Sequence, residues 1–349
     1  MVRRIAFAVP GDLATPTGGY AYDRRMIAEL ERLGWQIDVV DLGEGFPWPG
    51  SERRAAAQER LMAIPEDRMI IVDGLALGVL PEAAMRLRTR KLIALVHHPL
   101  ALEAGLTAKQ AEELRSSERA ALAASRCVVV TSAETARTLA ADYGVPPERI
   151  TVVRPGSDPA SMAKESSDGA VRLLSIGAIV PRKGFDVLIA ALATLTDLPW
   201  RLTIAGDRSR DAKAAALLDA DIVRFKLGGR IEVLGAVSRE RLDDLYSGAD
   251  LFVLASRYEG YGMAYAEAIA HGLPVIGTNA GAIPDTVPAG AGVLVAPDDV
   301  GALAQALRRL IENPDERHKL AASARDAAQR LPTWQDSAKI FSHALESAA

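Results

Sequence analysis

Two glutamates stand in an apolar stretch of the second half of the chain, where a carboxylate without a partner is costly. Glu259 belongs to the loop 258–262, in which aromatic residues alternate with glycine, and Glu267 follows it. Residues from Met263 predict a helix that ends at His271-Gly272, since glycine commonly terminates helices. A loop carboxylate beside the amides of a helix start can bind a polyhydroxylated ligand. Glu267, about one turn into this helix, could bind a second diol.

A solvated ion pair is the alternative explanation for the second glutamate. Glu267 and His271 are four residues apart, so they would face each other on an exposed helix surface. The remaining helix positions are almost all apolar or alanine, however. The loop, the spacing and the glycine stop also occur together, and this combination favours a binding role.

Two adjacent cations, Arg182 and Lys183, form the next chemical element. They lie in the loop after a predicted strand and before a predicted helix, in the run 175–184. Such a pair can neutralise a diphosphate and the negative charge that a departing diphosphate acquires. Paired basic residues in loops are usually only solvated, so this signal is weak when taken alone.

The first half of the chain offers two further candidate sites. Gly18 and Gly19 lie in a predicted loop before the first helix, where backbone amides can approach a phosphate or an acceptor. They do not match the fingerprint G-x-G-x-x-G, which argues against a nicotinamide enzyme. His97 directly follows a predicted strand and could bond a sugar hydroxyl or, through its carbonyl, stabilise an oxocarbenium-like centre. A histidine bonded into its own loop is the alternative, and the neighbouring His98 leaves the choice between the two open.

The elements that must position these residues alternate between short apolar strands and helices. Strands rich in β-branched residues are predicted at 4–9, 36–41, 69–73, 92–96, 127–131 and 150–153, and again at 173–177, 201–206, 231–234, 251–255, 275–277 and 292–295. Apolar strands separated by helices indicate parallel sheets that are buried on both faces. The sequence therefore predicts an α/β protein with two Rossmann-like, doubly wound domains facing a central cleft, and ligands bind at the carboxyl ends of such strands.

The domain boundaries follow from the Pro- and Gly-bearing stretch 154–159 and the polar stretch 164–169. We predict a first domain over 1–156, a second domain over 157–330, and a last, mostly helical segment over 331–349. Trp334, at the start of that last helix, could act as an aromatic anchor, with a plain surface tryptophan as the alternative.

Composition narrows the class of protein. Hydrophobic residues make up 49% and charged residues 25% of 349 positions, as in ordinary globular chains. The net charge of −4 does not favour a nucleic-acid partner. One cysteine and no apolar run of about 20 residues favour a soluble, cytoplasmic protein. Peripheral contact with the inner face of a membrane stays open, through the basic cluster at Arg86, Arg88, Arg90 and Lys91, although a solvated helix end explains that cluster more simply.

These motifs together resemble a known family. Ser-Arg-Tyr-Glu-Gly-Tyr-Gly…Ala-Glu-Ala…Gly-Leu-Pro-Val-Ile is similar to the signature of glycosyltransferase family 4, and Gly…Arg-Lys-Gly is similar to its phosphate clamp. The resemblance implies a retaining enzyme of the GT-B fold that uses a nucleotide-sugar donor. It implies that domain 1–156 binds the acceptor, that domain 157–330 binds the nucleotide-sugar, and that segment 331–349 crosses back to the first domain, anchored by Trp334. It implies catalytic roles for His97, Arg182, Lys183 and Glu259. It also implies that the donor contacts Gly18, Gly19, Gly177, Arg182, Lys183, Val237, Glu259, Gly260, Tyr261, Gly262, Met263 and Glu267.

The expected function is hexosyl transfer to an unidentified acceptor, which is a glycan, a lipid-linked molecule or a small molecule. No metal ion and no cofactor are expected, because two cations can do a metal's work at the diphosphate. An epimerase or sugar phosphorylase with the same clamp, or a non-catalytic nucleotide-binding relative, remains as an alternative. We further expect alanine at Glu259 or Lys183 to abolish transfer and to leave the thermal melt nearly unchanged.

Overall fold

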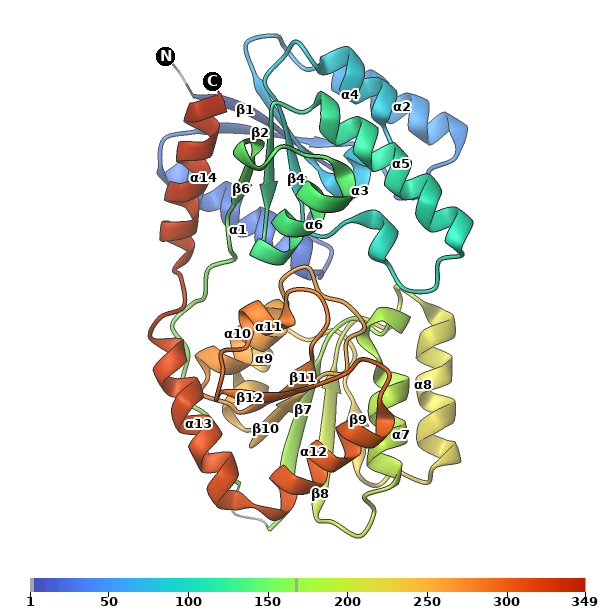
Figure 1. The fold of residues 1–349 in the computed structure, drawn as a ribbon, viewed down its shortest axis with the longest axis vertical. Coiled ribbons are helices and arrows are strands. Elements are labelled where there is room, and N and C mark those ends of the chain that lie inside the picture. The colour runs from blue at the N-terminus through green and yellow to red at the C-terminus, as the bar shows by residue number, and fades with distance from the viewer. Residues whose placement is uncertain (1–2, 167–168, 349) are drawn as a thin grey trace. The chain divides into compact units, whose positions relative to one another are not determined.

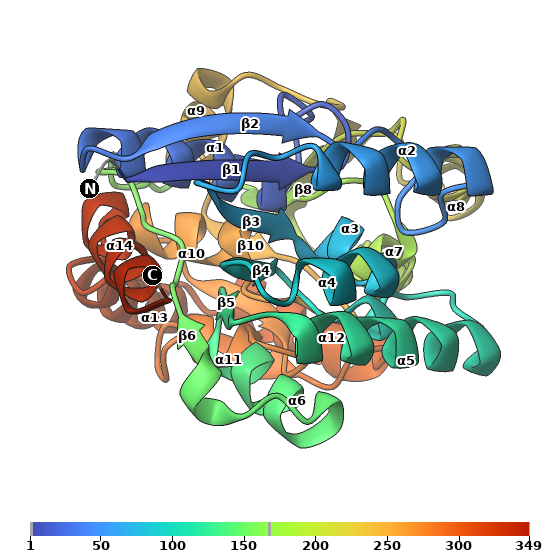
Figure 2. The same ribbon diagram turned by 90° about the horizontal axis from the view of Figure 1, so that it is seen from above.

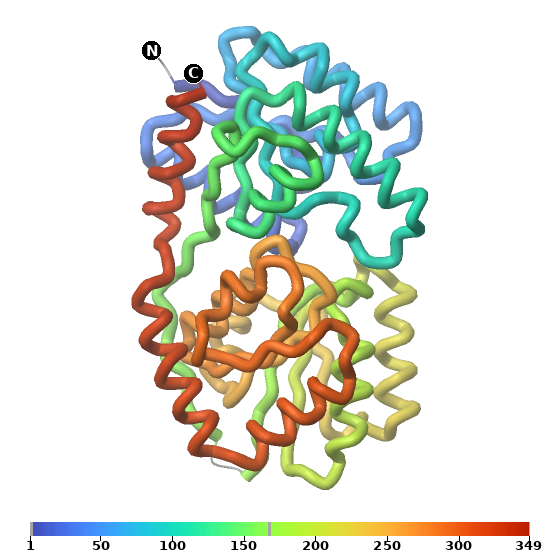
Figure 3. Tube along the Cα trace, viewed as in Figure 1, coloured from blue at the N-terminus to red at the C-terminus, as the bar shows by residue number. Residues whose placement is uncertain are grey.

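The chain divides into two compact units in a computed structural model that describes residues 3–166 and 169–348. One unit comprises Met1–Gly156 with Pro332–Ala349, and the other comprises Ser157–Leu331. Figure 3 shows the two passages of the chain from one unit to the other. Of the predicted polar stretch 164–169, residues 167 and 168 lie outside the described part.

The first unit is built on a six-stranded parallel sheet in the order β2-β1-β3-β4-β5-β6 (Figure 2). Every residue of β3, β4 and β5 is buried, as expected of strands covered on both faces. The order changes direction at β1, so the carboxyl ends of β1 and β3 form a topological switch point. The strands are β1 (Arg4–Val9), β2 (Gln36–Asp41), β3 (Met69–Asp73), β4 (Leu92–Val96), β5 (Cys127–Val130) and β6 (Ile150–Val152).

Helices cover both faces of this sheet. Helix α14 packs against α1 on one face, whereas α2, α4, α5 and α6 contact one another in sequence on the other (Figure 1). Trp334, the first residue of α14, is buried and meets the ring of Tyr22 edge-on at 5.9 Å, so it is not a plain surface tryptophan. The helices are α1 (Gly18–Arg32), α2 (Ser51–Met62), α3 (Gly74–Leu77), α4 (Pro81–Leu87), α5 (Ala108–Ala124), α6 (Ala133–Tyr143) and α14 (Trp334–Ala348).

The second unit repeats the principle with the order β12-β11-β10-β7-β8-β9, again all parallel. Its switch point lies between β7 and β10, which are neighbours in the sheet although they are distant in sequence. This arrangement and that of the first unit confirm the predicted doubly wound α/β fold. The strands are β7 (Val171–Ile176), β8 (Trp200–Ala205), β9 (Ile231–Val233), β10 (Leu251–Val253), β11 (Val275–Thr278) and β12 (Gly292–Val295).

The helices of the second unit also form two layers. Helix α7 contacts both α8 and α12, while α10 contacts α11 and α13. No helix in the described part of the chain combines the length and the apolar character that crossing a bilayer would take. The helices are α7 (Phe185–Ala193), α8 (Ala212–Arg224), α9 (Arg239–Ser247), α10 (Met263–Ala270), α11 (Ile283–Thr286), α12 (Val300–Glu312) and α13 (Pro314–Ala328).

Candidate functional site

The cation turn, which we define as residues 181–183, follows β7 at the switch point of the second unit. Pro181–Lys183 forms one turn of 3₁₀-helix. Gly184 ends the turn at φ +66°, and a side chain there would meet the carbonyl oxygen of Ala255 at 2.0 Å. A Cβ on Gly177 would lie 3.1 to 3.4 Å from the Lys183 stem. Glycine at these two positions therefore lets the turn pack against the strand ends and lets the Lys183 stem lie against Gly177, just after β7.

Glu259, which follows β10, meets both cations of the turn. Its Oε1 lies 2.6 Å from Lys183 Nζ, and its Oε2 lies 3.2 Å from Arg182 Nη1. The hydroxyl of Ser256 also donates to Oε1 at 2.6 Å. Burial alone would raise the pKa of Glu259, but the charges of Lys183 and Arg182 outweigh it and lower that pKa to about 2.

Two sequence motifs 76 residues apart thus form one cluster with two positive charges and one negative charge. The pairing also revises an expectation, because removing Glu259 would leave two partly buried cations without their carboxylate. We therefore expect stability as well as activity to fall.

Arg257 braces the cation turn through its backbone and its side chain. Its backbone amide donates to the carbonyl of Arg182 at 2.7 Å, and its guanidinium bonds the carbonyl of Pro181. The same guanidinium pairs with Asp186 at 2.7 Å and with Asp298 at 2.8 Å. Arg257 therefore fixes the backbone that carries the two cations.

The donor-binding loop predicted at 260–263 is held by its neighbours. The amide of Ala282 donates to the Glu259 carbonyl at 2.9 Å, and the Thr286 hydroxyl donates to the Tyr261 carbonyl at 2.5 Å. Gly260 and Gly262 are buried, whereas Tyr261 and Met263 are half-buried. Gly262, at φ +90°, precedes α10 and gives it no side-chain cap.

Glu267 lies near this loop on α10 and is paired, though not with His271. Its Oε1 accepts from Arg239 at 2.9 Å and its Oε2 accepts from the Tyr246 hydroxyl at 3.0 Å. His271 is buried instead, stacks on Tyr246 and bonds the Ser161 carbonyl at 2.8 Å, so the solvated-pair alternative is wrong. Val237, half-buried, lies two residues before Arg239.

The chain contains an Asp-x-Asp triplet, Asp219-Ala220-Asp221, whose two aspartates pair with arginines outside the cation turn. Asp219 and Asp221 belong to α8, where they pair with Arg208 and Arg224. The expectation that no metal is needed therefore rests on the cation turn alone.

In the first unit, Gly19 and His97 are in contact. The helix α1 begins at Gly18, two residues earlier than predicted, and Thr17 caps it by accepting from the Tyr20 amide at 3.1 Å. A Cβ on Gly19 would lie 3.2 Å from the His97 ring. Glycine therefore allows the imidazole to pack against the first helical turn.

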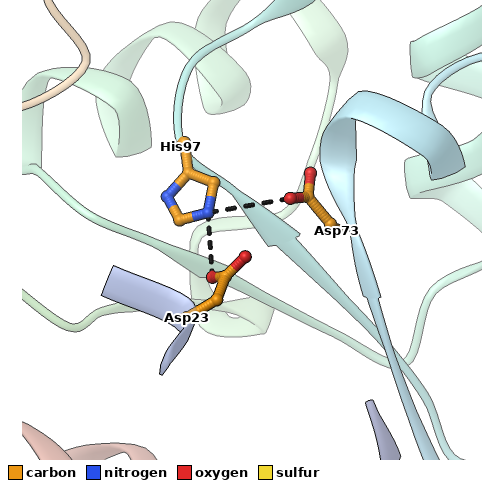
Figure 4. Close-up of side chains that lie close together, drawn as sticks. All are labelled: Asp23, Asp73 and His97. Atoms are coloured by element: carbon orange, nitrogen blue, oxygen red, sulfur yellow. Dashed lines mark hydrogen bonds and ion pairs between the residues drawn. The ribbon is translucent and has the colours of Figure 1, made fainter. Parts of the chain in front are cut away.

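His97 also belongs to a buried cluster that sequence reasoning missed. Its Nε2 lies 3.1 Å from Asp23 Oδ1 and 4.0 Å from Asp73 Oδ2 (Figure 4). Asp73 is the last residue of β3 and Asp23 lies on α1, so both flank the switch point of this sheet. The position of Asp73 at a strand end was a usable signal. Asp23, an acid in the buried stripe of α1, could be recognised only as an unexplained polar residue.

The other candidates of the first unit are tied to nearby groups. His98 Nε2 lies 3.3 Å from Glu103 Oε2, and both side chains are partly exposed. Arg90, from the basic cluster, donates to the Ile64 carbonyl at 2.8 Å. Glu118 of α5 is fully buried and accepts from the Leu100 amide, three residues after His97, at 2.9 Å.

Comparisons with known proteins agree with this architecture. Residues 157–327 match the family described as "Glycosyl transferases group 1", and residues 70–161 match "Glycosyltransferase Family 4". The chain is 29% identical over 313 residues to the MMP alpha-(1->4)-mannosyltransferase of Mycolicibacterium hassiacum, covering 83% of this chain and 73% of that one. It is 30% identical over 279 residues to the D-inositol 3-phosphate glycosyltransferase of Kineococcus radiotolerans, covering 71% of this chain and 64% of that one. It is 33% identical over 238 residues to the D-inositol 3-phosphate glycosyltransferase of Xylanimonas cellulosilytica, covering 63% of this chain and 57% of that one. The chain therefore spans less than two thirds of the length of these two D-inositol 3-phosphate glycosyltransferases.

Solved structures share the fold. Sucrose-phosphate synthase from Thermosynechococcus elongatus superposes with a TM-score of 0.83 at 22% identity, over 99% of both chains. Anabaena HepE in complex with UDP-glucose superposes with a TM-score of 0.79 at 20% identity, over 98% of this chain and 100% of that one. At these identities the likeness establishes the fold alone, which is GT-B.

Proposed function

Taking the chain as a glycosyltransferase of the GT-B fold, as its fold and family matches indicate, we propose that it moves a hexose from a nucleotide-diphosphate sugar to an acceptor with retention of configuration. One observation carries the proposal, namely that Glu259, Lys183 and Arg182 meet at the switch point of the second sheet. Ligands of doubly wound sheets bind at this position. A nucleotide-sugar donor is also supported by HepE, whose structures hold UDP and UDP-glucose.

Arg182 and Lys183 would bind the diphosphate. Their side chains are only 16% and 14% exposed, so their charges act in a medium that screens them less than bulk water does. With Glu259 ionised, the cluster keeps one net positive charge. Arg182 and Lys183 can therefore donate charge-assisted hydrogen bonds to the oxygens of a bound diphosphate. Because Lys183 rests on Gly177, it needs little reordering to make these contacts.

Glu259 and Glu267 would bind the sugar and the ribose of the donor, respectively. A carboxylate has about four acceptor positions, so both glutamates can accept hydroxyl hydrogen bonds while keeping the partners seen here. The loop 260–263 would add backbone amides to the sugar, and Val237 would contact the base. Arg239 and Tyr246 would keep Glu267 oriented toward the ribose.

The chemical step that fits these groups is a front-face displacement. The bond between the anomeric carbon and the diphosphate oxygen breaks, and the acceptor oxygen bonds the same face of an oxocarbenium-like sugar. The leaving diphosphate takes the acceptor's proton, and Arg182 and Lys183 stabilise its charge. No metal ion enters this scheme, so transfer should persist in a chelator.

Thermal-shift measurements with a panel of nucleoside diphosphates and their sugars test donor binding. A donor at a hundred times its dissociation constant adds about 2.7 kcal/mol of stability. Lys183→Ala should abolish the shift, and Lys213→Ala, at an exposed position of α8, should keep it. A panel without any shift, or a shift that survives Lys183→Ala, would contradict the assignment of the cation turn.

Product analysis with an isotopically labelled donor then tests the reaction. The proposal expects the label on an acceptor, with the anomeric configuration of the donor when the product is examined by NMR. An epimerised free donor would identify an epimerase, a sugar phosphate formed in inorganic phosphate would identify a phosphorylase, and binding without turnover would identify a non-catalytic relative.

A further inference from the structure

The cluster of His97, Asp23 and Asp73 brings two carboxyl groups and one imidazole together in a largely buried position. Asp23 is fully buried and Asp73 is 3% exposed, while the His97 side chain is 19% exposed. With a neutral imidazole and two carboxylates, this group would carry two negative charges away from water. Two buried carboxylates at close range do not both ionise readily unless compensating charge is present.

The hydrogen bonds show where two protons would reside. Asp23 Oδ1 is within hydrogen-bond distance of His97 Nε2, at 3.1 Å, so that nitrogen donates. Asp23 Oδ2 is buried and has no hydrogen-bond partner, and in Figure 4 it points toward Asp73. A proton on Asp73 would give this oxygen a donor. The other oxygen of Asp73 already accepts from the Leu75 amide at 2.7 Å.

Resting on the proposed function, we propose that Asp23 and Asp73 are positioning residues that keep one proton on each of His97 and Asp73, so that His97 presents a charged Nδ1–H donor to the substrate. Figure 4 shows Nδ1 turned away from both carboxylates. Within the described residues Nδ1 makes no hydrogen bond, while Nε2 is occupied by Asp23. A phosphate or hydroxyl oxygen of the substrate is the chemistry that such a donor recognises.

The surroundings of His97 support this assignment. Asp23 and then Asp73 act against burial, which by itself lowers the pKa of His97, and together they raise it to about 9. Burial and then Asp23 raise the pKa of Asp73 to about 7. Tyr22 of α1 presents its ring edge to the imidazole at 5.4 Å, and burial raises its pKa further, so it adds no charge. In the loop itself, His98 is engaged with Glu103.

NMR of protein labelled at its histidine side chains measures the proton on His97 directly, and only five histidines contribute signals. We expect both ring nitrogens of His97 to remain protonated through pH 8 in the wild type, and Asp23→Asn to move this titration down by about two pH units or more. Asp73→Asn imitates the protonated acid and should leave His97 charged at pH 6. His318, exposed in the second unit, serves as the unaffected reference.

The proposal is overturned if wild-type His97 is neutral at pH 7, or if Asp23→Asn folds and leaves its titration unchanged. Selective broadening of the His97 signals by stoichiometric Mn²⁺ would overturn it in favour of a divalent cation, since the same three groups lie within 4.8 Å of one another. The wild-type titration needs neither a folded variant nor turnover, so it stands even if the transfer reaction is not found.

Kinetics link the cluster to the reaction. If Asp23→Asn returns His97 to an ordinary pKa near 6.5, about a tenth of the histidine stays charged at pH 7.5, and kcat should fall about tenfold. Lowering the pH toward 5.5 should recover most of that loss. A merely structural role for Asp23 would lower kcat equally at both pH values, and this result would overturn the link.

Discussion

Neutralising Glu259 tests the cation turn most directly, because the lowered pKa of its carboxyl predicts the size of the effect. Each pH unit of pKa difference corresponds to about 1.4 kcal/mol. A carboxyl whose pKa falls from 4.5 to about 2 on folding contributes roughly 3 kcal/mol to the free energy of unfolding at pH 7. Its side chain is 7% exposed, so little of this is lost to solvent screening. Glu259→Gln should therefore cost about 3 kcal/mol at neutral pH.

The stabilisation by Glu259 should depend on pH in a defined direction. The folded pKa is depressed, so the contribution is complete above pH 4.5 and is lost as the pH falls toward 2. By pH 3 roughly 2 kcal/mol of it should have disappeared, and the gap between the wild type and Glu259→Gln should narrow by that amount. The measurement is urea denaturation at pH 7 and pH 3. Unfolding is followed by hydrogen exchange in peptides that cover β7 and α7, so the result reports the stability of the second unit separately from the first.

Two further variants sharpen this test. Lys183→Met with Glu259→Gln removes both charges and should recover part of the loss, because one of the two cations that lose the Glu259 carboxylate is removed as well. Asp197→Asn breaks an exposed ion pair with Arg308, 2.9 Å long, and should change stability far less. A gap between wild type and Glu259→Gln that is equal at pH 7 and pH 3, or absent at both, would refute the reasoning.

Four other variants test the cation turn, a buried carboxyl of the first unit and a close backbone approach in the second. Lys183→Ala should lower kcat about 10²-fold or more in steady-state assays, because the leaving group loses a charge-stabilising donor; unchanged kcat would remove it from the step. Arg257→Lys keeps the charge but loses the fork that braces the cation turn, and kcat should fall while the protein keeps its melting temperature. Burial raises the pKa of Glu118 to about 8, so its folded form retains a proton that the unfolded chain releases; wild-type melting temperature should fall between pH 5 and 8, and Glu118→Gln should flatten that slope. Gly206→Ala would place its Cβ 1.8 Å from the Gly177 carbonyl and should lower the melting temperature, whereas Gly228→Ala, which meets nothing within 4 Å, should not.

Local pattern accounts for most of what could be predicted about the fold. The alternation of β-branched runs and helices predicted the strands β1 at Arg4–Val9, β4 at Leu92–Val96 and β12 at Gly292–Val295 with the bounds seen in the structure. The ends of elements were predicted less well, as at α1, where Thr17 caps the helix before the two glycines. The start of a helix depends on a single capping hydrogen bond, and the periodic pattern of apolar residues does not reveal that bond.

The candidate site was predictable where the functional residues are close together in the sequence. Arg182 with Lys183, and Glu259 within its glycine-bearing loop, could each be identified because the cost of unpaired charge limits where such residues occur. Their mutual contact could not be identified, since it joins residues 76 positions apart through the pairing of β7 with β10.

The sequence by itself determined the doubly wound class, the identity of the charged motifs and their places at strand ends, because these depend on short-range periodicity and turn chemistry. Tertiary structure alone decided that Glu259 neutralises the cation turn, that Arg239 rather than His271 holds Glu267, and that Asp23 and Asp73 flank His97. The physical reason is that electrostatic partners are set by strand order and by burial. Neither quantity is encoded in the spacing of the residues that pair.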